Sequence, residues 1–345
     1  MQQMVSDFRK QLADGEVPRQ YSLFSEICEF LSSTLGRPVD LEAVFTVVDS
    51  IVRWAPERMG IAALYHAARA TGLGGRGTAP NKFPVVTPPG DTDSALSLQQ
   101  NFERFVRESC QIREGQSESI AAVYQALFNN IASVFGGYQD STGQYTHGDW
   151  PLFTTNYDAI LEHFWMDIAQ VSLNTGFSYN SVARMEVSSP ERLREMSGLR
   201  LFKLHGSITW LLDSRWGLTE QRVPPHEMKT YTGRKFLGQV MLYPIEEKEL
   251  YVEPYLTMYQ MLNRELAMAG RWLVIGYSFG DRIVRDIFLR NATKETRMVL
   301  VHPHANLVAE GLKGFKGKIR PFEKRFGGSD YVEVARELRD LVRQA

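Results

Sequence analysis

From Trp150 onward the sequence alternates short apolar runs with stretches of helical periodicity. The apolar runs are Leu152–Thr155, Leu201–Leu204, Val240–Tyr243, Trp272–Ile275, Met298–Val301 and Lys318–Phe322. The clearest helical stretches are Tyr255–Ala269, Asp281–Asn291 and Tyr331–Val342. When a helix connects two strands of one sheet, the crossover is right-handed and the strands run parallel. We therefore expect residues 149–345 to form an α/β, Rossmann-like region with a mostly parallel sheet.

Residues 1–148 carry a different signal, because their apolar residues recur at helical spacing. Val5, Phe8 and Leu12 share one helical face, and Leu23, Ile27, Phe30 and Leu31 share another. Further helices are expected after the N-cap residue Asp40 and over Met59–Ala70, Ser94–Ile112 and Ser119–Phe135, with loops at Thr71–Gly90 and Gly136–Asp149. The N-terminal part is thus expected to be a helical region, separate from the nucleotide-binding region at 149–345.

The charge balance and the cysteine count exclude several classes of protein. The 39 basic and 40 acidic side chains leave a formal net charge of −1, which gives no support to direct binding of nucleic acid or of a membrane surface. No apolar stretch is long enough for a membrane span, and residues 1–12 lack the apolar centre of a secretory signal, so cytoplasmic residence is expected. Cys28 and Cys110 are too few for a disulfide framework or a four-cysteine zinc site, and we interpret each as a small core residue.

Thr154–Asp158 is the first of three segments that carry useful chemistry, and it directly follows an apolar run. Its central residue, Asn156, has both a hydrogen-bond donor and an acceptor on one short side chain, which suits it to hold a ribose hydroxyl or a water. The alternative is a helix start, since Asn and Asp are favoured at N-caps.

The second segment, Lys203–Ser207, also comes at a predicted strand end. A histidine such as His205 can act as a general base near neutral pH, and Gly206 allows a ligand to approach the backbone closely. The alternative for His205 is a purely structural histidine.

In the third segment, Val274–Asp281, a buried strand leads into a Gly-x-Ser turn and then into a helix. The N-terminus of such a helix can hold a phosphate. Glycine turns between a strand and a helix are common, so this segment alone is weak evidence for a nucleotide site.

Taken in this order, the three segments resemble the motifs of the sirtuin family, and specifically of the bacterial sirtuin-like NAD-cleaving proteins of antiphage defence. In that family a Thr-x-Asn-x-Asp, a Leu-His-Gly and a Gly-x-Ser motif follow one another. The resemblance covers residues 150–325. It implies that Asn156 holds the attacking water or the nicotinamide-side ribose, and that His205 is the base that acts on the ribose hydroxyls.

The resemblance also implies a set of NAD-binding residues. Asp158 would line the nicotinamide pocket, and Thr155 of the same motif would belong to the binding site. Gly276 and Ser278 would hold the phosphates or the adenosine ribose. His302 stands where the family contacts the adenine side, although the family's usual Asn is absent there.

Two departures from the family pattern bear on the activity. Protein-deacylating sirtuins have a four-cysteine zinc ribbon, which this sequence cannot build, so the resemblance favours the NAD-cleaving branch with no metal. In addition, no Gly-Ala-Gly-x-Ser loop precedes the helical region, although in the family this loop wraps the pyrophosphate. A truncated start, a strand from another subunit and a protein that no longer turns over NAD are the three explanations.

The expected function is therefore that of an NAD glycohydrolase, which forms nicotinamide and ADP-ribose as an effector of antiphage defence. This reaction requires mainly that the protein orient the ribose and admit one water. The alternatives are a non-catalytic NAD- or ADP-ribose-binding or scaffold subunit and, less favoured, a protein deacylase. Because no sensor domain is evident, the resemblance implies a partner, such as a HerA-like ATPase or an Argonaute-type protein. A homo-oligomer is also expected.

Overall fold

The computed structural model describes residues 2–15, 18–35, 90–132, 149–180, 185–213, 217–220, 236–241, 253–327 and 329–344, with short pieces at 44, 47–48, 134, 138–139 and 145–146. The chain divides into two compact units, Met1–Cys110 with Leu242–Glu249 and Gln111–Met241 with Leu250–Ala345. The helix expected over Met59–Ala70 and the loop expected at Thr71–Gly90, except for its last residue, lie outside the described residues.

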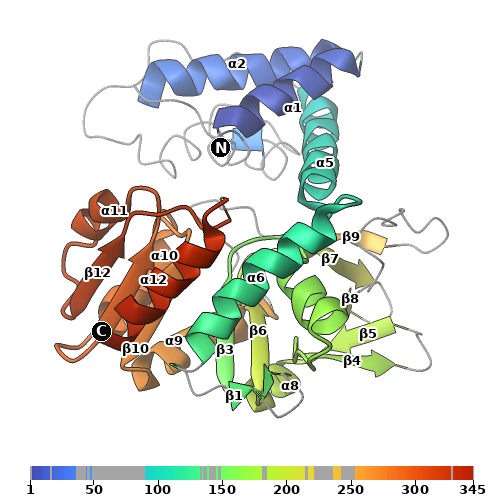
Figure 1. The fold of residues 1–345 in the computed structure, drawn as a ribbon. Helices are drawn as coiled ribbons and strands as arrows, with labels where there is room; N and C mark the ends of the chain where they lie inside the picture. Colours follow the sequence, from blue (N-terminus) through green and yellow to red (C-terminus); the bar gives the residue numbers. More distant parts are fainter. Residues whose placement is uncertain are drawn as a thin grey trace. The chain divides into compact units, whose positions relative to one another are not determined.

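The first unit contains the helices α1 (Gln2–Asp14), α2 (Pro18–Leu35) and α5 (Gly90–Cys110) (Figure 1). The ring of Phe8 on α1 is at the centre of its core, with its centroid 5.2 Å from the rings of both Phe24 and Phe105. Leu12, Leu23, Ile27, Phe30 and Leu31 are buried with it, as the helical spacing predicts. Val44 and Val48 are also helical and buried.

Parallel strands form two hydrogen-bonded sets in the second unit. In the first, β3 (Trp150–Thr154) pairs with β6 (Leu199–Lys203). In the second, β10 (Arg271–Ile275) pairs with β11 (Arg297–Val301), which pairs with β12 (Lys318–Phe322). These five strands coincide with five of the six apolar runs, so the predicted α/β class with parallel strands is confirmed.

A five-stranded antiparallel sheet is the part of the second unit that periodicity did not predict. Its order is β4 (Phe177–Asn180), β5 (Met185–Ser188), β8 (Gly217–Glu220), β7 (Gly206–Asp213) and β9 (Phe236–Met241). The expectation that the run beginning at Val240 joins the parallel sheet was wrong, because β9 pairs antiparallel with β7. An apolar run identifies a strand but does not specify the direction of its partner.

Helices α9 (Tyr255–Met268), α10 (Arg282–Asn291) and α12 (Tyr331–Gln344) occupy the three predicted helical stretches, and α11 (Ala305–Gly311) is an additional short helix between β11 and β12. The remaining elements are α6 (Gln116–Ala132), β1 (Tyr138–Gln139), β2 (Tyr145–Thr146), α7 (Ile160–Glu162), the π-helical turn η2 (His163–Ile168) and α8 (Pro190–Glu195). None of the described helices is both long and apolar enough to cross a membrane.

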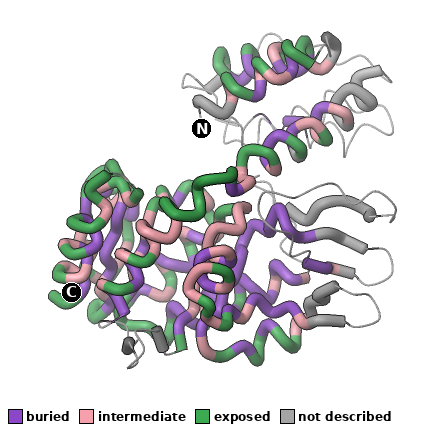
Figure 2. Tube along the Cα trace, turned by 45° about the vertical axis from the view of Figure 1, so that its right-hand side comes forward, coloured by how far each residue is buried: buried purple, intermediate pink, exposed green. Residues whose placement is uncertain are grey.

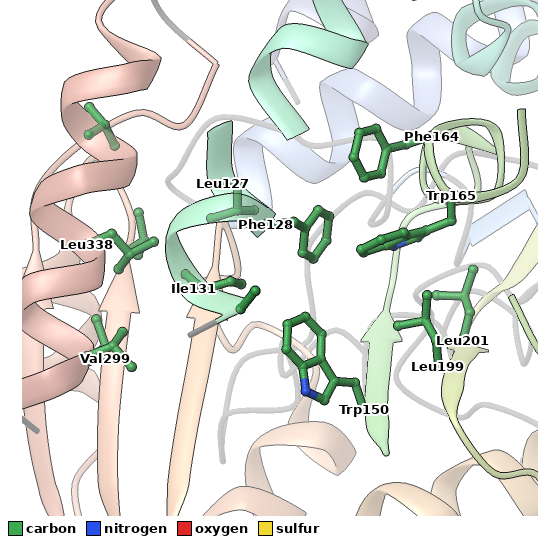
Figure 3. Close-up of a cluster of buried hydrophobic side chains, with 14 of the residues drawn as sticks. Leu127, Phe128, Ile131, Trp150, Phe164, Trp165, Leu199, Leu201, Val299 and Leu338 are labelled. Atoms are coloured by element: carbon green, nitrogen blue, oxygen red, sulfur yellow. The ribbon is translucent and has the colours of Figure 1, made fainter. Parts of the chain in front are cut away.

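The core of the second unit connects both parallel sets through α6. Phe128 of α6 has its ring centroid 4.4 Å from that of Trp165 in η2. The same cluster contains Trp150 of β3, Val299 of β11 and Leu338 of α12 (Figure 3). The buried stretches follow the strands and one side of each helix, while the other sides are exposed (Figure 2). This packing is what fixes the strand ends that carry the candidate site.

Candidate functional site

All three segments singled out in the sequence begin at the carboxyl ends of parallel strands. Thr155–Asp158 follows β3, Leu204–Ser207 follows β6, and Gly276–Asp281 follows β10. Because Thr154 lies opposite Lys203 in the register of β3 and β6, the first two segments start side by side. In open α/β sheets, this edge is where ligands bind.

His205 is the residue at which the segments meet. Its Nε2 lies 3.0 Å from Oδ2 of Asp281, and the two side chains are only 6% and 5% exposed. The ring of Tyr157, from the first segment, has its centroid 6.5 Å from that of His205. The structure therefore brings together one residue from each of the three segments, with His205 and Asp281 almost fully buried and Tyr157 half-buried.

Asp281 has a second role as the N-cap of α10. Its Oδ1 accepts hydrogen bonds from the backbone N–H groups of Ile283 and Val284, at 2.9 and 3.3 Å. Its Oδ2 also accepts from the hydroxyl of Tyr259 on α9, at 3.5 Å. Burial, and then the charge of Asp281, raise the pKa of Tyr259 well above its ordinary value, so this tyrosine stays protonated and can donate.

The first segment is held in place by contacts of its backbone and of Asp158. The carboxylate of Asp158 accepts a hydrogen bond from the N–H of Ile160 at the start of α7, at 3.1 Å, whereas the N-cap of this helix is Ala159 and neither Asn156 nor Asp158. The ammonium group of Lys203 donates to the carbonyl of Asp158 and lies 2.9 Å from a carboxylate oxygen of Glu162. The ammonium group of Lys203 therefore attaches the segment to β6 through the carbonyl of Asp158.

Asn156 and Ser278 are accessible, in contrast to His205. Both are exposed, and in the described part of the chain neither side chain forms a hydrogen bond. Asn156 uses its backbone N–H, which donates to Oγ1 of Thr154 at 3.0 Å. Thr155 beside it is half-buried. The amide and hydroxyl groups of Asn156 and Ser278 can thus reach a ligand.

The turn between β10 and α10 has two residues in the left-handed region. Gly276 has φ +70°, and a Cβ added to it would meet no atom within 4 Å. Phe279 has φ +58°, which is uncommon for a residue other than glycine, and its ring packs 5.1 Å from that of Phe288 on α10. The turn is therefore anchored on its Phe279 side and open at Gly276.

His302 lies beside Gly276 in the sheet, because the N–H of Gly276 donates to the carbonyl of Val301 at 2.8 Å. Its own Nδ1 accepts a hydrogen bond from the backbone N–H of His304 at 3.0 Å. Desolvation, and then the neighbouring His304, lower the pKa of His302, so its ring is neutral at pH 7. A neutral ring at this strand end is compatible with the predicted adenine side.

Four residues with clear structural roles were not predicted as site residues. Asp281 and Lys203 stood inside the quoted segments, and Asp281 directly precedes a helical stretch, which is the signal of an N-cap. The sequence contains no signal for the roles of Tyr259 and Glu162, because a single polar residue in a helical pattern does not indicate which residue it will contact.

Residues 151–318 match the family model of the SIR2-like domain, whereas a search of curated proteins gave no match. Among the residues that the structure describes, no group of three His, Cys, Asp or Glu side chains could hold a metal ion. The matched stretch extends from β3 into β12 and contains all three segments of the site. This part of the chain is therefore similar to the SIR2-like domain.

Proposed function

We propose that the protein is an NAD glycohydrolase, which cleaves NAD with water to nicotinamide and ADP-ribose. The observation that carries the proposal is the meeting of three strand-end segments at His205, which is buried and hydrogen-bonded to Asp281. The SIR2-like domain over residues 151–318 supports NAD as the substrate.

The turn after β10 supports binding of the dinucleotide. A ligand group can approach the backbone at Gly276, since no atom of the described chain occupies the place of a side chain there. The exposed hydroxyl of Ser278 offers a donor to a phosphate or a ribose. These features fit the diphosphate and the adenosine ribose, which are the polar parts of NAD away from the reacting bond.

In the proposed reaction the bond between ribose C1′ and nicotinamide breaks, and its electron pair leaves with nicotinamide. A water oxygen bonds to C1′, and the proton of that water or of a ribose hydroxyl passes to the imidazole of His205 and then to solvent. The amide of Asn156 orients the water or the ribose. The protein thus contributes orientation and one proton acceptor.

Release of nicotinamide from NAD by the purified protein tests this proposal. His205→Ala and Asn156→Ala should each lower the rate by about 10²–10⁴-fold, because each removes a positioned group. Asn306→Ala is the matched control, since Asn306 is also exposed but lies on α11, away from the three segments. Variants of His205 and Asn156 that cleave NAD at the wild-type rate contradict the proposal.

A second candidate is a subunit that binds NAD or ADP-ribose without cleaving it. It is favoured by the lack of a Gly-Ala-Gly-x-Ser loop in the 345 residues. Calorimetry with NAD and with ADP-ribose distinguishes the two candidates, because a binding subunit gives heat of binding without nicotinamide. If the protein neither bound nor cleaved NAD, and did not bind ADP-ribose, its role would be that of a scaffold subunit.

We further propose that the protein acts in antiphage defence as a homo-oligomer, with a partner such as a HerA-like ATPase or an Argonaute-type protein. The support is the resemblance to defence-associated sirtuin-like proteins. Light scattering tests the self-association, and a monomer at micromolar concentration contradicts it. Gel filtration with and without the product of a neighbouring gene tests the partner.

A further inference from the structure

We propose that Ser117, His163 and Asp167 form a second site, independent of the proposed cleavage of NAD, which hydrolyses small carboxylic esters. Oγ of Ser117 lies 3.1 Å from Nε2 of His163, and Nδ1 of the same ring lies 2.8 Å from Oδ2 of Asp167. The three side chains thus form one series of contacts from a hydroxyl through an imidazole to a carboxylate. This is the arrangement by which proteins activate a serine hydroxyl for attack on an acyl group.

The two contacts of His163 determine which of its nitrogens carries the proton. A carboxylate only accepts hydrogen bonds, so Nδ1 donates to Asp167, and the neutral ring has its lone pair at Nε2. The hydroxyl of Ser117 then donates to that lone pair. His163 is therefore placed as the base for Ser117, and Asp167 is the positioning residue that holds the ring.

The core holds Ser117 and His163 at this distance, although they lie 46 residues apart in the sequence. His163 begins η2, and the next two residues, Phe164 and Trp165, are buried. The ring of Phe128 on α6 lies 5.5 Å from that of Phe164 and 4.4 Å from that of Trp165 (Figure 3). The helix that carries the serine and the turn that carries the histidine are therefore fixed against one another. Such π-helical turns are rare and occur frequently at functional sites.

The start of α6 supplies access and hydrogen-bond donors. Ser117 is exposed and is the second residue of this helix, where backbone N–H groups have no carbonyl partner within the helix. These N–H groups and the Cα–Cβ bond of Ser117 all point towards the N-terminal end of the helix. An acyl group on Oγ thus has donors beside it that can stabilise the negative oxygen of a tetrahedral intermediate. The carboxylates of Glu118 and Asp167 favour an uncharged ester over an anionic one.

In the proposed reaction Oγ of Ser117 forms a bond to the carbonyl carbon of the ester, and its proton passes to Nε2 of His163. The bond from that carbon to the alkoxy oxygen breaks, and its electron pair stays on the oxygen, which takes the proton from His163 and leaves as an alcohol. Water then attacks the acyl-serine, and its proton passes through His163 to Oγ of Ser117. A carboxylic acid is released, and the charge of Asp167 stabilises the imidazolium in each step.

A fluorophosphonate reagent tests the nucleophile directly, because its phosphorus forms a bond to an activated serine oxygen and fluoride leaves. Ser119 is the matched control, since it lies in the same first turn of α6 and is also exposed. Mass spectrometry of the peptide that contains both serines should place the label on Ser117. The label should be lost in Ser117→Ala and in His163→Gln. Labelling of Ser117 no faster than that of Ser119 overturns the inference.

Hydrolysis of p-nitrophenyl acetate gives the second readout. Ser117→Ala and His163→Gln should each lower the rate by about 10²–10⁴-fold, because each removes a positioned group, whereas Ser119→Ala should retain the wild-type rate. A rate in Ser117→Ala equal to that of the wild type overturns the inference. If His163→Gln does not fold, Ser117→Ala still decides, because the replaced side chain is exposed.

Two variants of Asp167 separate its role on the imidazole from a merely structural one. Asp167→Asn should lower the rate of ester hydrolysis, because the amide no longer stabilises the imidazolium, and Asp167→Glu should restore part of the rate by returning a carboxylate to Nδ1. Equal rates in the two variants would contradict the positioning role. These assays contain no NAD, so their outcome and the outcome of the NAD-cleavage assay are independent.

Discussion

Lys203 and Glu162 form an ion pair of 2.9 Å in which both side chains are buried, 3% and 9% exposed. Lys203 is the last residue of β6, and Glu162 ends α7. The same ammonium group donates to the carbonyl of Asp158. One buried cation therefore attaches the loop that carries Asn156 to the strand that precedes His205.

Lys203→Met should destabilise the protein by about 3–5 kcal/mol, because it leaves the carboxylate of Glu162 buried without its cation. Urea denaturation measures the loss. Lys294→Met is the control: Lys294 is exposed, so its replacement should change the stability by no more than about 0.5 kcal/mol. Equal losses in the free energy of unfolding for the two variants would show that the buried carboxylate of Glu162 does not need Lys203 as its cation.

Leu338 and Leu307 test the core of the second unit. Leu338 of α12 is fully buried against α6, whereas Leu307 of α11 is 69% exposed. Leu338→Ala should cost about 2–5 kcal/mol through lost burial and a cavity. Leu307→Ala should cost about 0.5 kcal/mol or less. A small effect of Leu338→Ala in thermal or urea unfolding would mean that α12 contributes little to this core.

Gly276→Ala tests whether the turn after β10 receives a nucleotide. Gly314 is a matched control, because it also has positive φ, +96°, and open space where a Cβ would lie. Each alanine should cost about 1–2 kcal/mol of stability through backbone strain. Only Gly276→Ala should weaken NAD binding in calorimetry, since its methyl group occupies the place proposed for the ligand. Equal NAD affinities of the two variants would show that the phosphates of NAD do not bind at the turn after β10.

Cys28 should react slowly with iodoacetamide in the folded protein. Burial raises the pKa of its thiol to about 11, so the reactive thiolate is scarce at pH 8 and becomes abundant only as the pH approaches 11. Cys110 is only half-buried and should react faster. Mass spectrometry of the modified peptides measures both rates, and in urea the two should become similar. Rapid modification of Cys28 in the folded state would contradict its assignment to the core.

The sequence by itself determined the parallel strands and the helices α9 and α10 of the SIR2-like region, and the places of its functional segments. Runs such as Met298–Val301 are short, apolar and rich in residues that favour strands, so they specify strands from local information. Helices between them require parallel crossovers. The segments with Asn156, His205 and Ser278 could therefore be placed at one type of strand end before any contact was known.

Only the tertiary structure decided which residues meet. The contact between His205 and Asp281 joins positions 76 residues apart, and the pair of Lys203 and Glu162 joins positions 41 apart. The antiparallel pairing of β9 with β7 was also decided by the tertiary structure. The apolar pattern of a strand does not specify whether its neighbour runs parallel or antiparallel. Local propensity acts over a few residues. The contacts between distant residues form only when the core excludes water, because each polar group that is buried must then form a hydrogen bond or an ion pair within the protein.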